Sequence, residues 1–177
     1  MNNSPYLQQS QTIIRVDEKG NAIGEIDKWE AHKKGILHKG FSVALFHKDQ
    51  ILLQLRKHPV FDKVVDVTAS SHPLVIDGKN QPEEEAVHNC LVREWNVQRA
   101  ELTNFKNCGS FVYKAEDGAS YIEHEYCTFY SAVIERLPQP DLEFAYGYIL
   151  VELEFFKQNP QVYNLAPWVK EGMKLLP

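Results

Sequence analysis

The chain has 177 residues, of which 44% are hydrophobic and 24% charged, so it is long enough for one ordinary domain with a buried core. Its formal net charge of −5, with acids and bases mixed along the chain, argues against a nucleic-acid partner. Because no apolar run reaches about 18 residues and no basic-then-apolar leader opens the chain, we expect no membrane partner and a cytoplasmic location. The sequence leaves the oligomeric state open.

The N-terminal part predicts a short loose segment followed by a hairpin. Residues 1–10 are polar and expected to be flexible, which leaves residues 11–177 as a single domain. Apolar runs at residues 12–16 and 22–26 flank a Gly-Asn turn. This pattern predicts an N-terminal β-hairpin.

The middle of the chain predicts strands and one helix. Apolar runs at residues 41–46 and 51–55 predict a second hairpin, and the β-branched run at 64–69 predicts a short buried strand. Pro82 and three following glutamates open a helix that runs to about Trp95, because proline and acids suit a first helical turn.

The C-terminal part predicts two strands and two helices. Residues 111–114 and 121–134 read as strands around an Asp-Gly turn, and residues 148–158 and 168–175 read as helices. Strands, one helix, more strands and then helices predict a mixed α/β (α+β) fold, with a β-sheet sandwiched between helices.

Three histidines and two glutamates stand out as candidate metal ligands. His32 and His38 lie just before a predicted strand, and His72 follows the short one. Glu123 and Glu125 alternate near a strand start, so their side chains share one face of it. Paired carboxylates repel unless a positive charge lies between them.

A divalent cation would relieve that repulsion. Imidazoles and carboxylates together form a mixed nitrogen and oxygen set that can hold Mg²⁺, Mn²⁺ or Zn²⁺. The alternative is that the histidines are partly exposed loop residues and the glutamates lie on a solvated strand face. Spacing alone leaves both interpretations open.

In order and spacing, these residues resemble the type I isopentenyl-diphosphate isomerases of the Nudix superfamily. The resemblance covers the chain from about Ile13 to Trp168. It implies a Nudix-like fold and the interconversion of isopentenyl and dimethylallyl diphosphate, with a small diphosphate as substrate. It also implies that one divalent metal is held by His32, His38, His72, Glu123 and Glu125.

The resemblance extends to groups that would hold the diphosphate. Lys28 and Arg56 match cations that bind it, and Lys57 or His58 stands in for a further lysine. Glu94 matches the carboxylate that holds a second Mg²⁺ against the diphosphate. The alternatives are a surface lysine, a surface arginine and an exposed helix acid.

Two aromatic residues match positions around the reacting carbons. Tyr113 matches a tyrosine beside the catalytic glutamate, which is Glu125 here. Trp168 matches an aromatic residue that faces the reacting carbon, where a π face stabilises a carbocation. The alternative for Trp168 is a core residue at a helix start.

The chain departs from the family at the catalytic cysteine, whose position is Ser70. A serine hydroxyl has a pKa several units above that of a cysteine thiol, so it is a poor proton relay at neutral pH. We therefore expect Ser70 to slow or alter the chemistry. Cys127 lies on the same side as Glu125 and is not expected to replace the missing thiol.

The predicted helix departs from the Nudix hydrolases as well. Those enzymes carry several helical glutamates that bind Mg²⁺ and activate water. Only Glu94 remains in the corresponding stretch, 89–96, and Cys90 replaces an arginine of the isomerases. Three functions stay open: an isomerase, a diverged Nudix-type hydrolase of another small diphosphate, and a diphosphate-binding module without catalysis.

Overall fold

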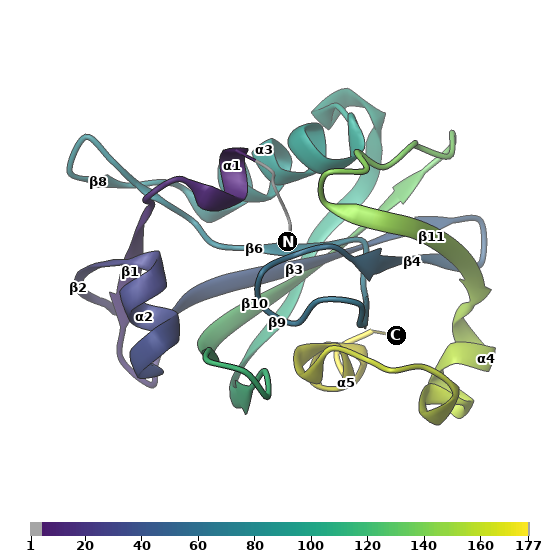
Figure 1. Cartoon of the computed structure of the whole chain (residues 1–177). Coiled ribbons are helices and arrows are strands. Elements are labelled where there is room, and N and C mark those ends of the chain that lie inside the picture. Colours follow the sequence, from purple (N-terminus) through teal and green to yellow (C-terminus); the bar gives the residue numbers. More distant parts are fainter. Residues whose placement is uncertain (1–4, 177) are drawn as a thin grey trace.

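The computed structural model describes residues 5–176 and contains a large mixed β-sheet with helices on both faces (Figure 1). Nine strands form this sheet: β1 Thr12–Val16, β2 Ala22–Asp27, β3 His38–His47, β4 Gln50–Arg56, β5 Val65–Asp66, β6 Ala69–Ser71, β9 Leu102–Glu116, β10 Ile122–Ile134 and β11 Ala145–Glu152. A separate pair consists of β7 Val75–Ile76 and β8 Lys79–Asn80.

The helices are shorter than the long strands, apart from α3. They are α1 Pro5–Gln8, α2 Lys28–Lys34, α3 Glu83–Trp95, α4 Leu153–Gln158 and α5 Pro167–Met173, with 3₁₀ turns at η1 Arg99–Glu101 and η2 Pro160–Val162. No helix within the described residues is long and apolar enough to cross a membrane.

Strand β3 is the centre of the sheet. It pairs with β1, β4 and β6 in antiparallel fashion and with β10 in parallel. Its side chains alternate between the two faces, as strand geometry requires. Val43 and Leu45 pack against α3, whereas Ala44 joins the cluster that contains α5. This alternation confirms the predicted sheet between layers of helices.

Several predicted elements are confirmed. The N-terminal hairpin forms between β1 and β2, and the helix predicted to end near Trp95 is α3. The predicted second hairpin is short, because β3 and β4 pair only at Phe46 with Ile51 and at His47 with Gln50. Beyond these pairs the strands separate, and β5 and β6 pair with them instead.

Other predicted elements differ from the structure. The expected helix at 148–158 is the strand β11 followed by α4, because Tyr148–Val151 pairs with β4. The strand expected at 64–69 is divided into β5 and β6. The strand expected at 111–114 extends back to Leu102, where it pairs with the end of β10.

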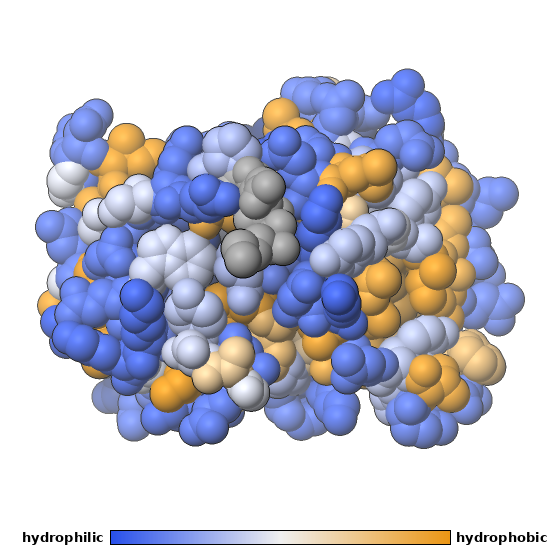
Figure 2. Space-filling view, viewed as in Figure 1, coloured by the Kyte–Doolittle hydropathy of each residue, from blue (hydrophilic) through white to orange (hydrophobic). Residues whose placement is uncertain are grey.

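The expected flexible segment at residues 1–10 lies partly outside the described residues. Where it is described, Pro5–Gln8 forms the helix α1 and the side chain of Leu7 is buried. The face seen in Figure 2 is largely hydrophilic, with apolar side chains gathered toward β11 and α4. Exposed large apolar residues of these two elements include Ile149 and Phe155.

Candidate functional site

Helix α2 and the turn after it bring two of the candidate ligands together. Asp27 caps the helix, since its Oδ1 accepts a hydrogen bond from the Glu30 amide at 3.0 Å. Gly35 ends it in the left-handed conformation, with φ of 61°, which glycine adopts without strain. The reversed chain then places His38, the first residue of β3, beside His32, with ring centroids 4.9 Å apart.

The sheet supplies the other three candidates. The parallel register of β10 with β3 sets Glu125 opposite His38, and Glu123 lies two residues earlier on the same face. His72 directly follows β6, whose last residue pairs with Phe41 of β3. Residues far apart in the sequence therefore meet at one end of β3.

The five side chains form a single cluster, in which His72 is half-buried and the other four are buried. One ligand atom from each of His32, His38, His72 and Glu123 lies within 4.8 Å of all the others. Glu125 completes the set, because its Oε1 lies 2.8 Å from Nε2 of His72 and 3.8 Å from Nε2 of His38. Glu123 Oε1 lies 3.2 Å from Nε2 of His32.

The Nδ1 atoms of two histidines face out of the cluster, and their hydrogen bonds orient the rings as binding to a metal ion would require. Nδ1 of His32 lies 2.6 Å from the Lys28 carbonyl, and Nδ1 of His38 lies 2.7 Å from the Ile36 carbonyl. Because a carbonyl only accepts, both Nδ1 atoms carry the proton and leave the Nε2 lone pairs facing inward in the neutral rings. Nε2 of His38 lies 3.2 Å from Nε2 of His72. Nitrogens bound to one ion at about 2.1 Å are separated by about 3 to 3.4 Å.

The carboxylates also suit a cation. Burial and the charge of Glu123 raise the pKa of Glu125 to about 8. Burial would raise the pKa of Glu123 as well, but the imidazole of His32 lowers it below its ordinary value. Oε2 of Glu123 is buried with no hydrogen-bond partner. A cation among these groups would favour both charged carboxylates.

Two neighbours hold Glu125 in place. The Tyr113 hydroxyl donates a hydrogen bond to Oε2 of Glu125 at 2.9 Å. Gly40 of β3 leaves the space that this carboxyl occupies, since a Cβ built at Gly40 would overlap it. His124, between the two glutamates, points away and bonds the Gly35 carbonyl at 2.9 Å. The expected alternation along this strand is thus present.

A small cavity of about 40 Å³ adjoins the cluster, and two cations line it. Lys28 is buried, its Nζ donates to Oε1 of Gln11 at 3.0 Å, and burial lowers its pKa to about 8. Arg56 forms a 2.8 Å ion pair with Asp66. Tyr6 and Leu7 of α1 lie over the same cavity.

Lys57 and His58 are placed differently from one another. Nζ of Lys57 donates to the Leu142 carbonyl at 2.6 Å, and Lys57 does not line the cavity. His58 does line it, is 8% exposed, and its Nε2 has no hydrogen-bond partner. Of the two residues, His58 is therefore the one that faces the cluster.

Glu94 reaches the cavity from α3 and is not an exposed helix acid. It is 2% exposed, and its Oε1 accepts hydrogen bonds from Arg93 at 2.8 Å and Cys90 at 3.3 Å. Its Oε2 is buried with no partner. Arg93 brings a guanidinium to this region of α3. The family match had indicated only that an arginine is replaced there by Cys90.

Ser70 and Trp168 belong to a second network beside the cluster. The Trp168 indole N–H lies 2.8 Å from Oδ1 of Asp66 and 3.0 Å from the Ser70 hydroxyl. Ser42 and Ser70 share a hydrogen bond at 2.9 Å. The sequence analysis did not single out Asp66, although a carboxylate inside the β-branched run at 64–69 is a usable signal.

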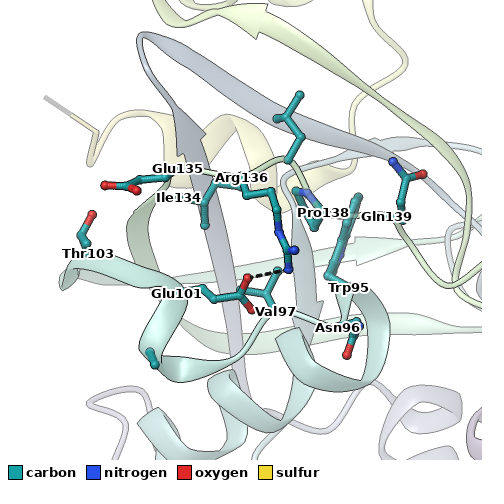
Figure 3. Close-up of a pocket in the computed structure, with 12 residues that line it drawn as sticks. Trp95, Asn96, Val97, Glu101, Thr103, Ile134, Glu135, Arg136, Pro138 and Gln139 are labelled. Atoms are coloured by element: carbon teal, nitrogen blue, oxygen red, sulfur yellow. Dashed lines mark hydrogen bonds and ion pairs between the residues drawn. The ribbon is translucent and has the colours of Figure 1, made fainter.

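A separate hollow of about 600 Å³ lies past the end of α3 (Figure 3). Glu101 and Arg136 form an ion pair across it at 3.1 Å, and its lining contains neither histidine nor cysteine. None of the candidate residues lines it. The candidate metal ligands lie together at the end of β3 instead.

Comparisons with curated proteins found isopentenyl-diphosphate Delta-isomerases among the relatives of this chain. No protein-family model matches the chain. An isopentenyl-diphosphate Delta-isomerase of Pectobacterium atrosepticum is 30% identical over 141 residues, which cover 77% of this chain and 74% of that protein. Another, from Aliivibrio fischeri (strain MJ11), is 36% identical over 123 residues, covering 66% of this chain. The chain spans just under two thirds of that protein, 65% of its length.

Solved structures give the fold. A Deinococcus radiodurans protein, DR0079, superposes with a TM-score of 0.69 at 16% identity, covering 93% of this chain and 98% of that one. A MutT Nudix hydrolase from Burkholderia pseudomallei superposes with a TM-score of 0.56 at 16% identity, covering 80% and 98%. With its Nudix fold and these relatives, the chain belongs to the isopentenyl-diphosphate Delta-isomerase family.

Proposed function

We propose that this chain is a metal-dependent isomerase that interconverts isopentenyl and dimethylallyl diphosphate. The observation that carries the proposal is the convergence of three imidazoles and two carboxylates, from α2, β3, β10 and the residue after β6, in one cluster. The names of the curated relatives supply the reaction. The cytoplasmic location and the small-molecule diphosphate partner remain predictions.

The protein groups divide into a binding side and a reacting side. Lys28, Arg56 and His58 line the cavity, and in this proposal they hold the diphosphate oxygens. Glu94 offers an unpartnered carboxylate oxygen for a Mg²⁺ that arrives with the diphosphate. The role of Lys57 in binding stays a prediction from the family match.

On the reacting side, Glu125 exchanges a proton with the substrate while the Tyr113 hydroxyl fixes its carboxyl group. When bound, a Mg²⁺, Mn²⁺ or Zn²⁺ ion supplies positive charge that sets the acidity of Glu125. Trp168 lies across from Tyr113, with ring centroids 5.7 Å apart, but it is buried in the core and the Arg56 guanidinium lies over its ring, 4.9 Å from the centroid. Its role toward a carbocation stays a prediction from the family match. Ser70 holds the position where the family has its second proton-transfer group.

A hydrolase that uses a helical carboxylate box is less well supported. Such an enzyme needs several carboxylates on the helix that is α3 here. The buried face of α3 carries apolar residues, including Leu91 and Trp95, and Glu94 is the carboxylate of this helix that lines the cavity. Diphosphate cleavage would therefore depend on the histidine and glutamate cluster.

One assay tests the three functions. Purified protein with Mg²⁺ or Mn²⁺ is given isopentenyl diphosphate, and proton and phosphorus NMR follow dimethylallyl diphosphate and free phosphate. Isomer formation that disappears in Glu125→Gln supports the proposal, and His124→Gln on the same strand is the matched control. Phosphate release supports a hydrolase. Saturable binding without turnover supports a binding module.

A further inference from the structure

Arg56, one of the cations of the cavity, is held in place by several other residues. It ends β4 and is 5% exposed. Its Nη1 donates a hydrogen bond to Oδ2 of Asp66 at 2.8 Å. Its Nε donates to the Phe61 carbonyl at 3.3 Å, and its Nη2 donates to the Val60 carbonyl at 3.4 Å. A guanidinium has five N–H groups, so one remains on each of Nη1 and Nη2.

Asp66 is the carboxylate that holds Arg56. It has no exposed surface and lies between Val65 and Val67, where an isolated carboxylate is costly. Its Oδ1 accepts hydrogen bonds from the Val67 amide and the Trp168 indole, each at 2.8 Å. Burial raises the pKa of Asp66, whereas Arg56 and the indole favour its charged form. Both of its oxygens are therefore bound to donors that the fold holds in place.

Trp168 supports Arg56 from the C-terminal end of the chain. The Arg56 guanidinium lies over the Trp168 ring, 4.9 Å from its centroid, where the π electrons attract a cation. The start of α5 is tied to β5, because the Ala166 amide donates a hydrogen bond to the Val65 carbonyl at 2.9 Å. Residues of β4, β5 and α5 thus form one buried unit around the guanidinium, made of Arg56, Asp66 and Trp168.

We propose that Asp66 and Trp168 are positioning residues that hold the Arg56 guanidinium at the cavity, where it binds the diphosphate group of the substrate. This inference rests on the proposed function, which places a diphosphate in that cavity. Asp66 and Trp168 act through Arg56 and need no contact with the substrate. This role concerns the diphosphate end of the substrate, whereas the family match places Trp168 at the reacting carbon.

An arginine that is already fixed binds a diphosphate at a lower entropic cost. A flexible arginine side chain loses conformational freedom when it is ordered on a ligand. Here the hydrogen bonds and the ring of Trp168 have ordered Arg56 in advance. The N–H groups that remain on its two terminal nitrogens suit phosphate oxygens. Loss of Asp66 or Trp168 should therefore weaken diphosphate binding even though the cation stays in the chain.

Binding of inorganic diphosphate with Mg²⁺ tests the proposal without any carbocation. Isothermal titration calorimetry compares the natural chain with Asp66→Asn, Arg56→Gln and the double variant. We expect Asp66→Asn to raise the dissociation constant about tenfold or more, because an amide offers one accepting oxygen to three donors. In the Arg56→Gln background the same change should add less than about twofold. Asp49→Asn, in the exposed turn before β4, is the matched control.

Steady-state kinetics with isopentenyl diphosphate separate positioning from a role in the chemical step. Trp168→Leu removes both the ring face and the indole N–H. We expect it to raise KM about tenfold with kcat changed by less than about threefold, since the diphosphate is held alike in the ground state and the transition state. Trp168→Phe keeps a ring beneath Arg56 and should have a smaller effect. A fall in kcat of about 100-fold with diphosphate affinity unchanged would overturn the positioning role of Trp168.

A second pair of variants covers the case in which Asp66→Asn does not fold, since breaking a buried ion pair destabilises a protein. Trp168→Leu is then compared in the natural chain and in Arg56→Gln. Its effect on the dissociation constant of inorganic diphosphate should shrink to less than about twofold in Arg56→Gln. An effect of the same size in both backgrounds would show a general change in the fold and overturn the inference.

The outcomes distinguish this inference from the function on which it rests. An unchanged dissociation constant in Asp66→Asn overturns it, as does a loss that is equally large in the Arg56→Gln background. Equal diphosphate affinity in Arg56→Gln and the natural chain also overturns it, while the isomerase function stands. If the natural chain neither binds diphosphate nor forms dimethylallyl diphosphate, the proposed function is overturned and this inference falls with it.

Discussion

His32, His38 and His72 lie together where α2, β3 and β6 meet, whereas His88 is buried by itself on α3. The ring of His88 packs on Phe105, with centroids 4.8 Å apart, and neither of its nitrogens has a hydrogen-bond partner. In the cluster, by contrast, the outer nitrogens of His32 and His38 are anchored to carbonyls. Histidines are buried in both regions, but among the described residues only the cluster brings several candidate metal ligands together.

The two regions also show that a shifted pKa does not by itself identify a site. Burial, together with His72 beside it, lowers the pKa of His38 to about 4. Burial lowers the pKa of His88 too, with Arg99 contributing in the same direction. What distinguishes the cluster is that its imidazole nitrogens and carboxylate oxygens face one another, at the separations expected between atoms that bind one ion.

Replacing one histidine by alanine in each region should give the largest difference in metal affinity. We expect His72→Ala to lower affinity for Mn²⁺ or Zn²⁺ by about 100-fold or more, because it removes a ligand from the cluster. His88→Ala should leave that affinity unchanged. Isothermal titration calorimetry on the folded variants measures both. Equal affinities in His72→Ala and the natural chain would contradict a shared metal site.

Gly40→Ala tests the packing around the cluster without removing a ligand. The added Cβ would overlap the carboxyl of Glu125, so we expect metal affinity to fall by about tenfold or more as that group is displaced. The control is the same change in a Glu125→Ala background, where the colliding carboxyl is absent and little further loss should follow. A full additional loss there would assign the effect to the backbone of β3.

Glu94→Gln should weaken diphosphate binding beside α3 and leave the metal affinity of the cluster unchanged. Oε2 of Glu94 is buried without a partner and lies at the cavity of Lys28 and Arg56. We expect about a tenfold loss in Mg²⁺-dependent binding of inorganic diphosphate, with the metal affinity of the cluster kept. Glu84→Gln, an exposed change on the same helix, is the matched control. Unchanged diphosphate binding in Glu94→Gln would remove Glu94 from the site.

Much of the fold follows from local patterns. The hairpin of β1 and β2 and the helix α3 were predictable, because turn residues and helical spacing are local signals. The strand β11 was not, since Tyr148–Val151 is a short continuous apolar run that suits a helix or a strand, and its pairing with β4 decides its state. Tertiary pairing also divides the run at 64–69 between two neighbours, β4 and β3.

The candidate site was predictable as a set of residues but not as a geometry. Alternation placed Glu123 and Glu125 on one face, yet nothing local brings them to His72. That meeting depends on the parallel register of β10 with β3. Asp66 escaped attention because its partners, Arg56 and Trp168, converge only in the fold.

His88→Leu should have the smallest effect and should appear in stability alone. Removing two buried ring nitrogens without partners is expected to stabilise the fold by about 1 kcal/mol, with metal affinity unchanged. The pKa of His88 is lower in the fold than in the unfolded chain, so below about pH 6.5 the unfolded state binds the proton first and stability falls. Leucine cannot take up that proton. The difference in Tm between His88→Leu and the natural chain should therefore widen from pH 7.5 to pH 5.5 in thermal unfolding followed by circular dichroism, and a constant difference would show that His88 finds a partner on protonation.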